Sequence, residues 1–143
     1  MVGLGGVHYP QVQAVVAYMP SNVIWGGFGG DVPYDAPAWS YGGVSLLLIS
    51  GQDDQMWPSS VMADMIVARL NVHHYAFSYR HLSYPDAGHT IGIPYLPASA
   101  GYGRHSLSGA TYAFGGTARG NALASADAWR QVLGFLDRNL KQR

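Results

Sequence analysis

Residues 46–60 read LLLISGQDDQMWPSS, and this stretch decides the fold. Residues 46–49 are all leucine or isoleucine, and a Ser-Gly pair leads from them toward two acids, Asp53 and Asp54. A short unbroken apolar run is typical of a strand that is buried on both faces, as in a parallel sheet. The polar residues directly after it then stand at the carboxyl end of the strand, where the sites of open α/β sheets gather. The two acids are therefore the first candidates for a functional site.

The composition is typical of a folded globular protein. The 143 residues fit one domain, 1–143, of which 48% of the residues are hydrophobic and 11% are charged. Eight basic and eight acidic residues balance without a basic run, so we expect no nucleic-acid partner. Cysteine is absent, which excludes a disulfide framework and thiolate metal ligands. No apolar run approaches the ~20 residues of a membrane span, and no basic residue precedes an apolar leader, so we expect a cytoplasmic protein.

The remaining elements complete an open sheet. Strands are predicted at residues 12–18, 44–50 and 77–83, and a helix at 58–70 lies between the last two. The order predicts the α/β class, with a mostly parallel sheet, flanking helices and a right-handed crossover. The predicted apolar stripe of the first helix comprises Val61, Met62, Met65, Ile66 and Leu70.

The carboxyl-terminal part of the chain divides into a predicted loop and a predicted helix. Residues 90–121 are rich in Gly, Ser and Ala with little periodicity, which indicates a long loop region. After it, Ser125 is predicted to cap the second helix. The apolar stripe predicted for this helix comprises Trp129, Val132, Leu133, Leu136 and Leu140.

A histidine follows the third predicted strand, as Asp54 follows the second. Because the carboxyl ends of neighbouring parallel strands lie side by side, we expect the carboxyl group of Asp54 to touch the imidazole of His89. Such a carboxylate fixes the tautomer of the ring and stabilises the imidazolium formed in general-base catalysis. Taken alone, each residue is better explained as a helix cap or a loop residue, and only the pair favours a function. The adjacent His73 and His74 cannot converge on one ion, so we expect no metal and no cofactor.

Several segments resemble one family. LLLISGQDDQMWPSS, YPDAGHTIGIPYLP (84–97) and residues 113–140 are similar to the carboxyl-terminal catalytic domain of acyl-CoA thioesterases and bile acid-CoA:amino acid N-acyltransferases. Residues 12–27 and 37–43 are similar to upstream pieces of the same domain.

The resemblance implies a partial α/β-hydrolase fold, with Asp54 as the triad acid and His89 as the base. It also implies a fatty acyl-CoA thioester as the substrate, whose acyl group passes to water or to an amino acid. Asp53 is implied to be a turn or cap residue. Positions near the site are implied for Trp57, Pro94, Tyr95 and Pro97.

The nucleophile of the family has no counterpart in this sequence. The family carries Ser or Cys in a motif of the Gly-x-Ser-x-Gly type, which is absent here, and MVGLGG places Gly3 where the Ser would stand. The preceding strands and the oxyanion-hole loop are also missing from the sequence. Without an activated hydroxyl or thiol, His89 has no proton to take for acyl-enzyme formation, so we expect the chain alone to be a poor or inactive thioesterase.

The first strand would leave one edge of the sheet bare, which predicts a homo-oligomer or a partner chain that covers it. Two other functions stay open on the residues alone. The first is an inactive, truncated domain that acts as a binding or interaction module, and the second is a dienelactone-hydrolase-like or peptidase-like hydrolase.

Overall fold

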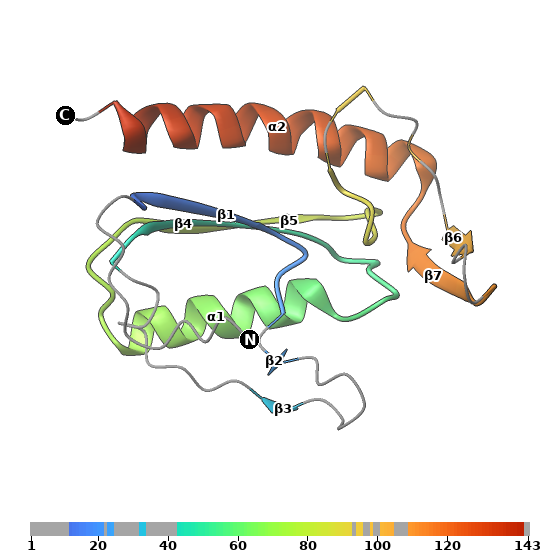
Figure 1. Ribbon diagram of the computed structural model, residues 1–143, viewed down its shortest axis with the longest axis horizontal. Coiled ribbons are helices and arrows are strands. Elements are labelled where there is room, and N and C mark those ends of the chain that lie inside the picture. The colour runs from blue at the N-terminus through green and yellow to red at the C-terminus, as the bar shows by residue number, and fades with distance from the viewer. Residues whose placement is uncertain are drawn as a thin grey trace.

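A parallel sheet between two helices forms the body of the protein in the computed structural model (Figure 1). The structure describes residues 12–21, 23–24, 32–33, 43–92, 94–95, 98, 101–104 and 109–141. The sheet has the strand order β1-β4-β5, and both neighbouring pairs are parallel. The three strands are β1 (Ala14–Tyr18), β4 (Ser45–Gly51) and β5 (Tyr79–Tyr84). The helices that flank the sheet are α1 (Ser59–Val72) and α2 (Ala118–Leu140). The predicted α/β class with a parallel sheet and flanking helices is confirmed.

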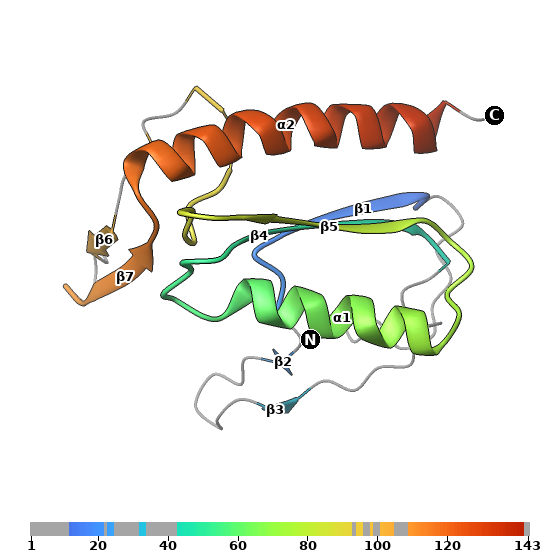
Figure 2. The ribbon, with the colours of Figure 1, turned by 180° about the vertical axis from the view of Figure 1, so that it is seen from behind.

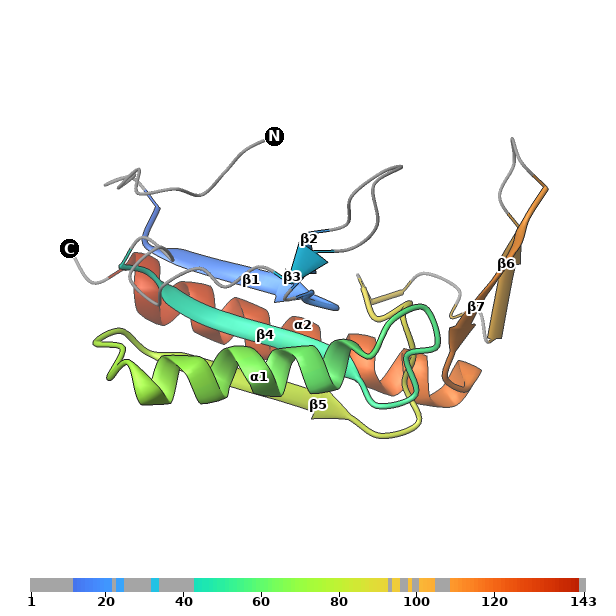
Figure 3. The same cartoon turned by 90° about the horizontal axis from the view of Figure 1, so that it is seen from below.

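Two short antiparallel pairs accompany this sheet. They are β2 (Val23–Ile24) with β3 (Val32–Pro33), and β6 (Gly101–Arg104) with β7 (Thr111–Gly115). The second pair stands beyond the carboxyl ends of β4 and β5, at the end of the molecule where α1 and α2 both begin (Figure 3). The β6–β7 pair therefore lies beside the edge where the sequence places its candidate site.

Strand β4 is the centre of the core because its side chains alternate between two apolar layers. All seven of its residues are buried. Leu46 and Leu48 pack in the cluster with α1, whereas Leu47 and Ile49 pack in the cluster with α2. The two helices cover opposite faces of the sheet, as the view from behind also shows (Figure 2). An unbroken apolar run is what a strand needs when both of its faces are covered.

The apolar stripe predicted for α1 is partly wrong. The helix buries Ile66 and Leu70, as predicted, together with Ala63. Val61 and Met65 are instead 59% and 55% exposed. The helix is apolar around most of its circumference, so periodicity could not choose between its faces, and packing against β4 made the choice.

The predicted loop at 90–121 and the predicted cap at Ser125 are also wrong in part. This region contains β6, β7 and the first turn of α2, which begins at Ala118. Thr117 caps the helix, since its hydroxyl accepts a hydrogen bond from the N–H of Gly120 at 2.9 Å. Strand β6 reads GYGR, and its glycines carry no side chains that could reveal the alternation of a strand.

The stripe predicted for α2 is correct at its centre and wrong at its edges. Val132 is buried, and Trp129 and Leu136 pack partly buried against the core. Leu133 and Leu140 are each 51% exposed, because the helix turns Ala128 and Phe135 toward the sheet in their place.

Strand β1 lies at one edge of the sheet. It pairs with β4 alone, and no other strand in the described part of the chain pairs with it. A partner or a second copy at this edge stays a prediction. Neither helix among the described residues combines the length and hydropathy needed to cross a membrane.

Candidate active site

Asp54 and His89 meet at the carboxyl ends of β4 and β5. The Nδ1 atom of His89 lies 3.0 Å from Oδ2 of Asp54. Because an ionised carboxylate can only accept, the imidazole donates its Nδ1–H in this bond. The side chain of Asp54 is 1% exposed and that of His89 is 16% exposed. The predicted contact is therefore present, and Nε2 of the ring has no hydrogen-bond partner among the described residues.

The carboxylate of Asp54 is held on its other side as well. Its Oδ1 accepts the backbone N–H groups of Met56 at 3.0 Å and Trp57 at 3.2 Å. Burial raises the pKa of Asp54, but hydrogen bonds from the His89 imidazole and the Trp57 N–H hold this pKa below its ordinary value. Asp54 is thus an ionised acceptor at neutral pH.

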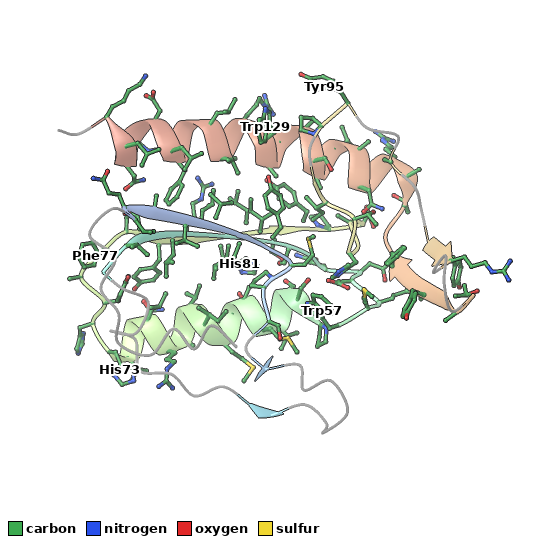
Figure 4. The ribbon with its side chains drawn as sticks, in the orientation of Figure 1. Trp57, His73, Phe77, His81, Tyr95 and Trp129 are labelled. Carbon is green, nitrogen blue, oxygen red and sulfur yellow. The ribbon has the colours of Figure 1, made fainter. Side chains whose placement is uncertain are left out.

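Two aromatic rings lie next to the imidazole of His89. Trp57 meets it edge-on, with ring centroids 4.2 Å apart and an interplanar angle of 76°. Phe114 in β7 lies nearly parallel to it at 6.2 Å and 16°. The indole Nε1–H of Trp57 donates to the carbonyl oxygen of Met19 at 3.2 Å, which ties this ring to the end of β1. Trp57 lies at the amino-terminal end of α1, where Figure 4 labels it, so the position near the site that the resemblance implied for it is confirmed.

Asp53 lies in the turn after β4, as predicted, and it joins two loops of the site instead of capping α1. Its backbone N–H donates to the carbonyl oxygen of Ala87 at 3.0 Å. Its Oδ2 accepts the N–H of Gly116 at 2.8 Å, whereas α1 has no side-chain cap. Hydrogen bonds from Gln55 and from the Gly116 N–H lower the pKa of Asp53. This carboxylate binds Gly116, the residue after β7, to the loop after β4.

The loop that carries His89 packs backbone to backbone against β7. The N–H of His89 donates to the carbonyl oxygen of Phe114 at 2.7 Å. A Cβ atom on Gly88 would lie 2.3 Å from that oxygen, so this close approach requires glycine. Three segments, 53–54, 86–89 and 114–117, therefore meet at the site. The sequence reasoning missed the third segment, although its Gly-Gly pair next to an aromatic residue was a signal for such an approach.

The other positions implied by the resemblance are scattered. Pro94 is buried. Tyr95 is 98% exposed and lies on the far side of α2 from the sheet (Figure 4). Pro97 lies outside the described residues. Tyr95 therefore does not touch the imidazole.

A second hydrogen-bonded Ser-His-Asp series lies between the sheet and α1. His81, labelled in Figure 4, places Nε2 at 2.6 Å from the Ser50 hydroxyl and Nδ1 at 2.9 Å from Asp64. Ser50 is fully buried within β4, whereas the carboxylate of Asp64 is 73% exposed. This burial is the reverse of what a nucleophile and its supporting acid need, so we do not assign catalysis to this series.

Metal ligands do not gather in the described part of the chain. No group of three or more His, Asp or Glu side chains there could hold a metal ion. His73 is the residue after α1, and His74 follows it with a positive φ of 50°.

One known protein family matches most of the chain. The family described as BAAT / Acyl-CoA thioester hydrolase C terminal matches residues 38–142. The chain belongs to this family. The match covers β4, β5 and α2, and with them Asp54, His89 and the loop at 114–117.

Individual members of the BAAT / acyl-CoA thioester hydrolase family support the assignment. Acyl-coenzyme A thioesterase 2, mitochondrial, of Mus musculus is 41% identical over 96 residues, which are 67% of this chain and 21% of that protein. Acyl-coenzyme A thioesterase 6 of Homo sapiens is 34% identical over 97 residues, with shares of 68% and 23%. Peroxisomal succinyl-coenzyme A thioesterase of Mus musculus is 33% identical over 95 residues, with shares of 66% and 22%. The chain spans about a fifth of the length of these curated relatives.

Proposed function

We propose that this chain provides the acid and the base of a site that hydrolyses acyl-CoA thioesters or transfers their acyl group, with Asp54 as the acid and His89 as the base. The observation that carries the proposal is the 3.0 Å bond from Nδ1 of His89 to Asp54, which leaves Nε2 available to a reactant. Family membership supports an acyl-CoA as the substrate class. The names of the relatives include both acyl- and succinyl-CoA thioesterases. That the acyl chain is that of a fatty acid is a separate part of the proposal, which is tested with palmitoyl-CoA.

The chemistry follows from the state of the imidazole. With its proton on Nδ1, His89 can accept a second proton at Nε2 from a hydroxyl, a thiol or a water molecule. The deprotonated oxygen or sulfur attacks the thioester carbonyl, the carbon–sulfur bond breaks, and the imidazolium returns its proton to the leaving CoA thiolate. Asp54 stabilises the imidazolium between these two transfers. Direct attack by water needs no further side chain, so it is the reaction for which this chain can be tested alone.

The test is hydrolysis of palmitoyl-CoA, followed by release of the free thiol. We expect slow turnover by the wild type and a loss of about 10²-fold or more in His89→Gln, since a positioned general base contributes about 10²–10⁴-fold. His73→Gln is the matched control, because His73 is exposed at the end of α1, and it should leave the rate unchanged.

Two outcomes contradict the proposal. The first is a His89→Gln rate equal to that of the wild type. The second is a wild-type rate equal to that of the blank. In the second case, tight binding of a palmitoyl-CoA thioether, which cannot be hydrolysed, would identify the chain as a binding module instead.

A further inference from the structure

Helix α2 buries two polar side chains one turn apart on the face that it turns toward the sheet. Asn121 is 0% exposed and Ser125 is 8% exposed. Their buried neighbours on this helix, Ala124, Ala128 and Val132, are apolar. A buried polar group costs free energy unless it is hydrogen-bonded, so the partners of these two side chains indicate why polar residues stand here.

Both partners belong to the loop that carries His89. Oδ1 of Asn121 accepts the N–H of Gly88 at 2.8 Å, in a bond that is itself buried. The hydroxyl of Ser125 accepts the N–H of Gly92 at 3.2 Å. One turn of α2 therefore binds the loop at the residue before His89 and again three residues after it.

These two bonds restrict the position of the imidazole. The backbone N–H of His89 is bound to Phe114, and the flanking N–H groups are bound to α2, so the main chain on both sides of the residue is held. With the main chain held, the 3.0 Å approach of Nδ1 to Asp54 is set by the side-chain torsions alone. A misplacement of about 1 Å at a reacting group can cost about 10²-fold in rate.

We propose that Asn121 and Ser125 are positioning residues that hold His89 against Asp54, an inference that rests on the proposed function of this pair. Asn121 binds the glycine adjacent to the base, so it has the larger effect. Both side chains act through the backbone of residues 88–92, at the N–H groups of Gly88 and Gly92.

A spectroscopic test measures the contact itself and does not depend on turnover. The pKa of Asp54 is held down in part by the bond from His89, so a looser loop should raise the pH midpoint of the Asp54 carboxyl carbon signal in ¹³C NMR. We expect an upward shift in Asn121→Ala, a smaller one in Ser125→Ala, and a return to the wild-type midpoint in Ser125→Thr, which keeps the hydroxyl.

Asn139→Ala is the matched control. Asn139 also lies on α2 and donates through its side chain to the carbonyl oxygen of Phe135 at 2.7 Å, but at the opposite end of the helix. It should leave the Asp54 midpoint unchanged. An unchanged Asp54 midpoint in both Asn121→Ala and Ser125→Ala overturns the proposal. If Asn121→Ala does not fold, the comparison of Ser125→Ala with Ser125→Thr decides alone. Palmitoyl-CoA turnover, measured in parallel, tests the proposed function separately, because a wild type without turnover still reports the Asp54 midpoint.

Discussion

Asp54→Asn replaces one carboxylate oxygen at the centre of the site with an NH₂ group, and the structure determines how the amide must turn. In the wild type, one carboxylate oxygen accepts from Met56 and Trp57 and the other accepts from His89. An amide has one oxygen and one NH₂ group, so only one side can keep its acceptor. If the oxygen faces the backbone, the NH₂ donates to Nδ1 of His89, and the imidazole must then carry its proton on Nε2.

The size of this preference follows from the backbone N–H groups. The Met56 N–H lies at an exposed position, where water can replace a lost acceptor. Only the partly buried Trp57 N–H therefore contributes to the cost of turning the amide the other way. Leaving such a donor without an acceptor costs about 1–3 kcal/mol, which favours the orientation with oxygen toward the backbone roughly 5- to 150-fold. A His89 with its proton on Nε2 cannot accept another there. The same change in a serine-protease triad lowers kcat by about 10⁴-fold, so we expect a loss of at least about 10²-fold here.

The assay is ¹⁵N NMR of the imidazole nitrogens at neutral pH, which distinguishes the two tautomers, together with palmitoyl-CoA hydrolysis. Asp64→Asn is the control, since Asp64 also contacts a histidine Nδ1, at 2.9 Å, but belongs to the separate series with His81. It should leave the spectrum of His89 unchanged. A proton that remains on Nδ1 of His89 in Asp54→Asn would refute the reasoning from the hydrogen bonds.

Three further predictions concern stability. Because the pKa of Asp54 is lower in the folded state than its ordinary value, the ionised carboxylate stabilises the fold above about pH 5, and this stabilisation is lost as the pH falls through the folded pKa. In urea unfolding, the difference in free energy of unfolding between wild type and Asp54→Asn should therefore be smaller at about pH 3 than at about pH 7. Leu70→Ala should cost about 2–5 kcal/mol because Leu70 is 0% exposed, whereas Val61→Ala, at a 59% exposed position, should stay within about 0.5 kcal/mol, and equal costs would contradict the observed helix face. Gly88→Ala should destabilise the fold by about 1–3 kcal/mol and speed amide exchange in β7, because its Cβ would lie 2.3 Å from the carbonyl oxygen of Phe114, and unchanged exchange would argue against this close approach.

The nearness of Asp54 and His89 could be predicted because it depends on a rule of sheet geometry. Each residue lies just past a strand, and the two strands are neighbours and parallel, so their carboxyl ends share one edge. The catalytic roles of the two side chains remain predictions, since contact alone does not demonstrate proton transfer.

The other parts of the site could not be predicted in this way. Asp53 contacts Gly116 across 63 positions, and Asn121 contacts Gly88 across 33. These contacts depend on where β7 ends and where α2 begins, and the sequence reasoning placed the start of α2 too late. Glycines allow the backbones to approach this closely, but a Gly-Gly pair in the sequence does not indicate which distant segment will approach it.

The sequence by itself determined the central strand, because the four consecutive apolar residues 46–49 suit a strand that is covered on both of its faces. It also determined which acid and which histidine would share an edge of the sheet. Only the tertiary structure decided which face of α1 is buried, how β7 closes over the His89 loop, and that α2 holds this loop through Asn121 and Ser125. The physical reason is that periodicity reports the local alternation of side chains, whereas these features arise from backbone groups of distant segments that find hydrogen-bond partners only when the chain is packed.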